Sequence, residues 1–99
     1  MNPVPKSIRR LVLAERVVLS SKASRRLFED GFSIEDLRES LLSGVVTKKE
    51  QDERKIARYK YIIEGPSLSG RTLYSCGKIV KDEKGRDYFL HTAHEAEKS

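Results

Sequence analysis

The clearest pattern of apolar and polar positions lies between Arg58 and Val80, where two runs rich in β-branched and aromatic residues flank Gly65–Gly70. Valine, isoleucine and tyrosine suit a pleated, half-buried surface, and a cluster of glycine, proline and serine marks a chain reversal. The pattern therefore predicts two antiparallel strands. Because an isolated hairpin is marginal in water, we expect this pair to belong to a larger sheet that is covered on one face.

Before Gly44 the apolar residues recur at helical spacing. A first helix is predicted to open at Pro5 and Ser7 and to bury one apolar stripe. The stripe consists of Ile8, Leu11 and Val12. The period then changes in the β-branched segment Val17–Leu19, which predicts a short strand.

A second helix is predicted from Ser20 or Ser21 to about Asp30. Either serine can act as the N-cap by accepting a hydrogen bond from the first turn. Gly31 is expected to end the helix in a left-handed conformation. The buried face carries Ala23 and Leu27.

The segment Ser33–Asp36 has the form of an N-cap followed by acidic residues, which favour the positive end of a helix dipole. It predicts the start of a third helix, and Gly44 is expected to end that helix. The apolar stripe consists of Ile34, Leu37 and Leu41, widened by Leu42.

After the third helix the pattern becomes extended. Val45–Thr47 predicts another strand, and the charged run Lys48–Lys55 predicts a mobile loop or an exposed strand end. A turn at Asp82–Arg86 is expected to precede a last strand, Asp87–His94. The remaining residues, Glu95–Ser99, are predicted to form a frayed tail.

The length of 99 residues, with 37% hydrophobic and 35% charged side chains, is typical of one small globular domain. Helical spacing before Gly44 and strand patterns after it predict an α+β fold. We therefore expect a single domain over residues 1–99, in which two to three helices pack on one face of a small antiparallel β-sheet.

No apolar run approaches the roughly 18 residues of a membrane-spanning helix. Residues 1–5 lack the apolar stretch of a signal peptide. The single cysteine, Cys76, has no partner for an internal disulfide, which fits a reducing compartment. We expect a cytoplasmic protein that does not enter the membrane, with Cys76 acting as a small hydrophobic residue.

The formal net charge of +5 is unevenly distributed along the chain. Residues 1–28 carry seven lysine or arginine side chains and one acidic side chain, whereas residues 29–44 carry five acidic side chains and one arginine. Positive charge returns between Lys48 and Lys81. A basic surface attracts polyanions, so RNA or DNA is the expected partner. The alternative is a solvated basic surface that binds no nucleic acid.

Several ligand sites are not favoured by the spacing of the residues. His91 and His94 are three apart on a predicted strand, so they point to opposite faces and do not converge on a metal ion. The glycines lack the spacing of a phosphate-binding loop. The third helix carries three acids against one arginine, so DNA phosphates would repel it from the major groove. We therefore expect no metal and no cofactor.

The predicted sheet then offers the most suitable basic surface. Alternation places Arg58 and Lys60 on one face of the first hairpin strand, and Leu90, Thr92 and His94 on one face of the last. Metal-free RNA cleavage needs a group that deprotonates the 2′-hydroxyl, cations beside the phosphate, and an acid that protonates the leaving 5′-oxygen. Histidine, lysine, arginine and tyrosine supply these functions. The alternative is that His94 only ends a strand and the cations are solvated.

Three segments resemble a bacterial family of small uncharacterised domains. Lys22–Asp36 resembles the signature H-A-x-x-R-x-x-x-x-G-I-S-x-E-D, Arg71–Tyr74 resembles a strand opening R-P-L-H, and Thr92–Glu95 resembles a terminal T-x-Y-E. The genes of that family often lie beside those of MqsA-type zinc-finger antitoxins. In element order the family is similar to the MqsR and RelE toxins, which are mRNA-cleaving ribonucleases. Lys22 stands where the family has histidine, and His94 where it has tyrosine.

The resemblance implies a RelE/MqsR-like fold and a toxin-like, metal-independent endoribonuclease (an mRNA interferase) of a type II toxin-antitoxin pair. RNA, free or on the ribosome, and a cognate antitoxin protein are the implied partners. The alternative is a non-catalytic nucleic-acid-binding or protein-interaction module. The candidate site comprises His94 as general acid or base, Arg26, Lys60 and Arg71 as phosphate-binding cations, and Tyr74 as a stacking platform or secondary proton donor. Arg26 and Arg71 match the motifs, whereas Lys60 rests on chemistry alone.

Overall fold

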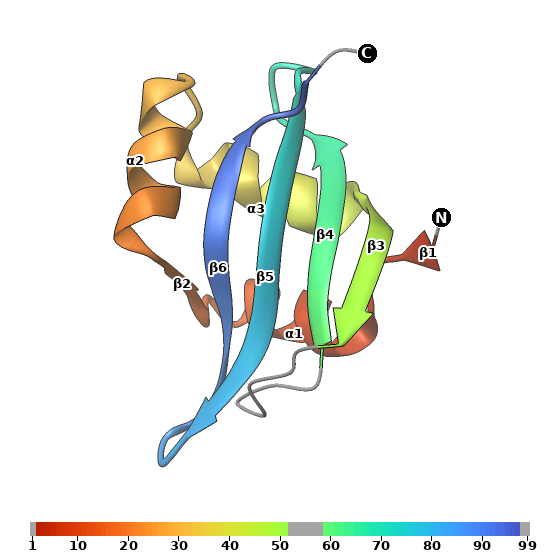
Figure 1. Cartoon of the computed structure of the whole chain (residues 1–99), viewed down its shortest axis with the longest axis vertical. Coiled ribbons are helices and arrows are strands. Elements are labelled where there is room, and N and C mark those ends of the chain that lie inside the picture. The colour runs from red at the N-terminus through yellow and green to blue at the C-terminus, as the bar shows by residue number, and fades with distance from the viewer. Residues whose placement is uncertain (1, 52–58, 98–99) are drawn as a thin grey trace.

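The computed structural model describes residues 2–51 and 59–97, and it confirms the predicted α+β class (Figure 1). Three helices pack against a six-stranded, mostly antiparallel sheet. The helices are α1 (Lys6–Leu13), α2 (Ser21–Glu29) and α3 (Ile34–Ser43). The strands are β1 (Asn2–Pro3), β2 (Val17–Leu19), β3 (Val45–Gln51), β4 (Tyr59–Pro66), β5 (Thr72–Asp82) and β6 (Gly85–Glu95).

The strands follow the spatial order β1-β3-β4-β5-β6-β2. The predicted hairpin is confirmed over its described residues, with Ile63 opposite Ser75, while Arg58 lies outside them. The expectation of an antiparallel sheet is wrong at one edge, because β2 runs parallel to β6, with Val17 opposite Tyr88 and Leu19 opposite Leu90.

Local capping signals set the helix boundaries. The Ser20 hydroxyl accepts a hydrogen bond from the Ala23 N–H at 3.0 Å and so begins α2. At α3 the Ser33 hydroxyl accepts from the Asp36 N–H, and the Asp36 carboxylate accepts from the Ser33 N–H at 2.8 Å. These reciprocal bonds satisfy N–H groups that have no partner inside the helix. Gly31 adopts the expected left-handed conformation, with φ of +81°.

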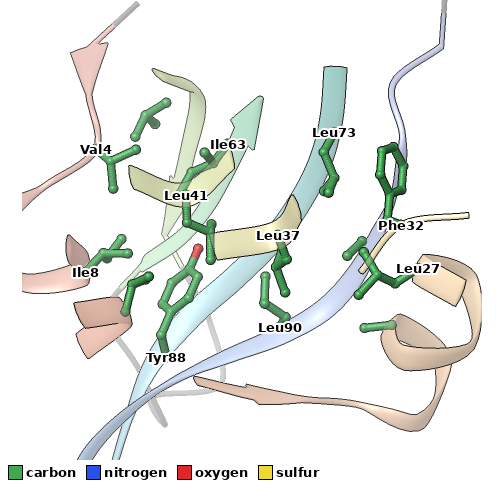
Figure 2. Packing of buried hydrophobic residues seen from close by; sticks show 14 residues of the cluster. Val4, Ile8, Leu27, Phe32, Leu37, Leu41, Ile63, Leu73, Tyr88 and Leu90 are labelled. Atoms are coloured by element: carbon green, nitrogen blue, oxygen red, sulfur yellow. The ribbon is translucent and has the colours of Figure 1, made fainter. Parts of the chain in front are cut away.

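One cluster of buried apolar residues fills the space between the helices and the sheet. Figure 2 shows Tyr88 and Leu90 of β6 pointing into the same cluster as Leu37 and Leu41 of α3. Ile34 was predicted to join this stripe, but its side chain is half exposed. It is the first residue of α3, where the helix has reached the border of the covered region. Burial of Leu37 and Leu41 therefore anchors the helix.

A β-bulge in β6 changes which side chains share a face. In β5, Cys76 lies opposite Thr92 and the next residue, Gly77, lies opposite Leu90. His91, between Leu90 and Thr92, therefore has no residue opposite it and is the extra residue of the bulge. Leu90 and Ala93 are consequently both buried on the helix side. The prediction that Leu90 shares a face with Thr92 and His94 is therefore wrong, because the bulge shifts the alternation by one residue.

The C-terminal boundary also differs from the prediction. Glu95 belongs to β6, and its N–H donates a 2.7 Å hydrogen bond to the Asp30 carboxylate. The Ala96 N–H donates to the Thr72 carbonyl at 2.9 Å. These bonds attach the end of the chain to α2 and β5, so the expected frayed tail is wrong for Glu95 and Ala96. Residues 98–99 and residues 52–55 of the predicted loop lie outside the described residues.

In residues 2–51 and 59–97, no helix combines the length and the apolar character that crossing a membrane would require.

Candidate functional site

The face of the sheet opposite the three helices, here called the open face, carries the candidate chemistry. Figure 1 shows the sheet in front of the helices, so that this face points toward the viewer. Glu64 on β4 lies directly opposite Tyr74 on β5, and Tyr74 lies directly opposite His94 on β6. Directly opposite residues point to the same side of a sheet. Glu64, Tyr74 and His94 therefore form a row across three strands.

The Tyr74 and His94 rings stack, with centroids 4.8 Å apart and planes inclined by 21°. Burial raises the pKa of the Tyr74 hydroxyl, and the neighbouring Cys76 and Glu64 raise this pKa further. Tyr74 therefore stays protonated at neutral pH and can act as a hydrogen-bond donor. Its ring at the same time fixes the plane of the imidazole.

The tautomer of His94 follows from its backbone contact. Its Nδ1 lies 2.8 Å from the Glu95 carbonyl oxygen. A carbonyl oxygen only accepts, so Nδ1 must donate and carry a proton. Nε2 is then the nitrogen that exchanges a proton with a bound molecule: it is basic in the neutral ring and acidic in the imidazolium.

Helix α2 adds cations beside this row. Lys22 and Arg26 are four residues apart and so share one face of the helix. With the row they line a shallow, open groove of about 510 Å³. The groove is lined by Lys22, Arg26, Glu64, Tyr74, Thr92, His94 and Glu97. Of the predicted site residues, Arg26, Tyr74 and His94 are thus brought together.

Glu64 and Lys22 were not among the predicted site residues. Glu64 directly precedes the Gly/Pro loop, so the sequence indicates only that it lies at the end of a strand. The pairing of β4 with β5 places it opposite Tyr74. In the sequence motif, Lys22 stands where the family has histidine. Its spacing of four from Arg26 is the sequence signal that links it to the site.

Arg71 lies outside this groove and caps the end of α2. Its guanidinium donates to the Asp30 carbonyl at 2.9 Å and to the Gly31 carbonyl at 3.4 Å. It lies 3.5 Å from a Glu95 carboxylate oxygen and 4.2 Å from the centre of the Phe32 ring. Cations near a helix C-terminus satisfy carbonyls that lack partners. These contacts fasten the α2–α3 turn to the end of the sheet.

We expect Arg71→Ala to lower the free energy of unfolding by about 2 kcal/mol, because hydrogen bonds to a charged group and a stacked ring are lost together. Chemical denaturation measures this change, with the exposed Arg25→Ala as the control. If Arg71→Ala keeps full stability but loses affinity for RNA, Arg71 is the phosphate-binding residue predicted from the sequence instead.

Lys60 lies on the open face but does not line the groove. It stands opposite Glu50 of β3. Glu50 forms a 2.7 Å ion pair with Lys48, and both side chains are substantially exposed. On the next strand, burial raises the pKa of the Cys76 thiol, although the positive charge of Lys60 partly offsets this. Lys60 therefore lies on the open face outside the groove, beside the ion pair of Lys48 and Glu50.

Within residues 2–51 and 59–97, no three histidine, cysteine, aspartate or glutamate side chains lie together as a metal-binding group would require. In comparisons with protein-family models, with curated proteins and with solved structures, nothing matches this chain. The family resemblance of the three motifs therefore stays a prediction, and a functional argument depends on the geometry of the groove.

Proposed function

We propose that this protein is a metal-independent endoribonuclease of the toxin type, which acts on RNA in the cytoplasm and is neutralised by an antitoxin protein. The observation that supports this proposal best is the row of Glu64, Tyr74 and His94 beside the cations of α2. It joins two proton-transfer groups, an aromatic ring and positive charge in one groove, which is the set that cleavage through the 2′-hydroxyl requires.

The two proton-transfer groups flank the position of the scissile phosphate. Glu64 and His94 are each one strand away from Tyr74, so their Cβ atoms are roughly 10 Å apart. A phosphate above the Tyr74 hydroxyl therefore lies within reach of both side chains. The Glu64 carboxylate accepts the proton of the 2′-hydroxyl, and Nε2–H of the His94 imidazolium donates a proton to the leaving 5′-oxygen. The 2′-oxygen bonds to phosphorus as the bond to the 5′-oxygen breaks.

The remaining groups stabilise charge and position the RNA. Lys22 and Arg26 approach from α2, where their positive charges counter the negative charge that develops on the phosphate oxygens. Tyr74 donates a hydrogen bond from a hydroxyl that burial keeps protonated. Lys60, which lies outside the groove on the same face, binds a phosphate farther along the RNA strand.

We expect Glu64→Gln to slow RNA cleavage by about 100-fold, because the amide cannot accept the 2′-hydroxyl proton. RNA binding should be retained or slightly tightened, because one negative charge leaves the groove. Single-turnover cleavage and filter binding measure the two effects separately. Glu97→Gln removes a charge from the same groove without removing a member of the row, and serves as the matched control. Equal cleavage by Glu64→Gln and wild type would remove Glu64 from the mechanism.

Induced expression in bacteria tests the proposed function in cells. We expect growth arrest and shortened mRNA with the wild-type chain, and normal growth with His94→Ala at equal protein level. Co-expression of an antitoxin from a neighbouring gene should restore growth. A non-catalytic nucleic-acid-binding or protein-interaction module is the alternative, and harmless expression with intact RNA would support it.

A further inference from the structure

Strand β2 ends the sheet with an unpaired edge. The Arg16 carbonyl accepts from the Tyr88 N–H, and the Ser20 N–H donates to the Leu90 carbonyl, both at 2.9 Å. The direction of the backbone N–H and C=O groups alternates along a strand. The N–H and C=O of Val18 therefore also point toward β6, whereas those of Val17 and Leu19 point away from it. In the described part of the chain no strand pairs with this outer side. Two N–H and two C=O groups are thus presented outward.

The opposite edge of the sheet is less suited to pairing. There the end strand β1 consists of Asn2 and Pro3, and proline has no N–H to donate to a further strand. Strand β3 extends beyond β1 with the charged residues Lys48, Lys49 and Glu50, and charged side chains discourage the addition of a strand at an edge. Strand β2 carries no proline and no charge, and its central residue Val18 has 45% of its surface exposed. Such an edge is a template for pairing with another strand.

We propose that β2 pairs with β2 of a second copy of this chain, antiparallel across a two-fold axis at Val18. This register places Val17 of one copy opposite Leu19 of the other. In a hydrogen-bonded antiparallel pair, two opposite residues exchange both of their N–H···O bonds. The two symmetry-related pairs therefore satisfy every outward backbone group of both strands. In β2 the backbone N–H and C=O groups of the first and last residues point outward. Only this register pairs all of these groups with those of a second β2.

The side chains beside this edge support the same arrangement. Val17 and Leu19 border an apolar hollow of about 190 Å³, which α1 and α3 close with Val12, Leu37 and Leu41. The hollow is smaller than the roughly 300 Å³ at which cofactor sites begin. The half-exposed Ile34 also lines it. Pairing brings the Val17 and Leu19 side chains of a second copy to its mouth and covers apolar surface that one copy leaves open.

The charges at the edge are complementary to a second copy. Glu15 has a φ of 59°, where glycine is usual, its side chain is 83% exposed, and its carboxylate lies 3.8 Å from the Arg38 guanidinium. With the two-fold axis at Val18, the turn that holds Glu15 lies toward the end of the second copy's β2 from which α2 begins at Ser21. The first turn of α2 contains no acidic residue. Glu15 is thus placed where a carboxylate stabilises a helix N-terminus.

Sedimentation equilibrium of the full chain tests this proposal independently of any catalytic activity. We expect a dimer for the wild type and a roughly 10- to 1,000-fold weaker association for Val18→Lys, because two like charges meet on the axis. Val18→Glu should weaken association similarly, and a mixture of the two variants should restore the dimer. Leu68→Lys adds the same charge at an exposed apolar residue of the β4–β5 loop and should remain dimeric.

Amide hydrogen exchange identifies the surface directly in the wild-type protein. The N–H groups of Val17 and Leu19 should exchange slowly in the dimer and rapidly in Val18→Lys. Those of Val18 and Ser20, which face β6, should be protected in both proteins. A wild type that is monomeric at about 1 mM, where even weak association is populated, overturns the proposal. A dimer that Val18→Lys leaves intact also overturns the proposal. The same holds if Leu68→Lys dissociates the dimer as strongly as Val18→Lys does.

Discussion

Replacing His94 by alanine is expected to slow RNA cleavage by roughly 10²–10⁴-fold while the domain stays folded. The His94 ring is stacked on Tyr74 and is held by the Glu95 carbonyl, so in the proposed mechanism its Nε2 transfers the proton. The side chain is only partly buried, so its removal leaves the core intact. Single-turnover cleavage and thermal denaturation of the same preparation measure the two quantities.

His91→Ala is the matched control for this experiment. His91 is the extra residue of the β6 bulge, and its ring meets the edge of Phe89 at a centroid distance of 5.0 Å. It does not line the groove of Tyr74 and His94. We expect near-normal cleavage and a modest loss of stability. A folded His91→Ala that does not cleave, beside a fully active His94→Ala, would place the catalytic histidine at the bulge.

Gly65→Ala is expected to lower the free energy of unfolding by about 3 kcal/mol. An added Cβ would overlap the Ser40 carbonyl oxygen and lie 2.8 Å from the Gly44 Cα. Both neighbours are backbone atoms, so relief requires α3 to move away from β4 and opens the core around Leu41. Urea denaturation with circular dichroism measures the change.

Gly70→Ala is the comparison variant, because there the free energy of unfolding is lowered by backbone conformation alone and not by steric overlap. Gly70 has a φ of +89°, and nothing lies within 4 Å of an added Cβ. Only the left-handed backbone is penalised there, which costs about 1–2 kcal/mol. If Gly65→Ala is no more destabilising than Gly70→Ala, the close approach of α3 and β4 does not limit the packing.

The helix boundaries were predictable because their signals are local. The hydroxyls of Ser20 and Ser33 and the left-handed Gly31 act within one turn of the residues that they cap. The hairpin was predictable for a similar reason, since its turn residues adjoin its strands. Each of these features follows from neighbours in the sequence.

The features that were not predicted depend on contacts between distant residues. The bulge at His91 becomes visible only when β6 is paired with β5, and it reverses the expected face of Leu90. The parallel direction of β2 follows from its pairing with β6, a strand about 70 residues later in the sequence. Glu95 is ordered by Asp30, which is 65 residues away in the sequence. No local pattern encodes such pairings.

For the same reason, only some of the candidate site residues lie together in the structure. Arg26, Tyr74 and His94 come together because the motif residues of α2 meet the ends of β5 and β6. Arg71 satisfies the end of α2 instead of entering the groove, and Lys60 lies farther along the open face. Residue chemistry alone does not separate a cation that caps a helix from one that faces a phosphate.

The most direct test of the central claim uses purified protein, excess EDTA and an RNA that the wild type cleaves at one position. The proposed mechanism predicts cleavage in EDTA and a product that ends in a 2′,3′-cyclic phosphate. A matched RNA with a single 2′-deoxy nucleotide at that position should bind equally and remain intact, because the attacking oxygen is missing. Cleavage that EDTA abolishes, or that continues at the deoxy position, would contradict the proposed metal-independent attack by the 2′-hydroxyl.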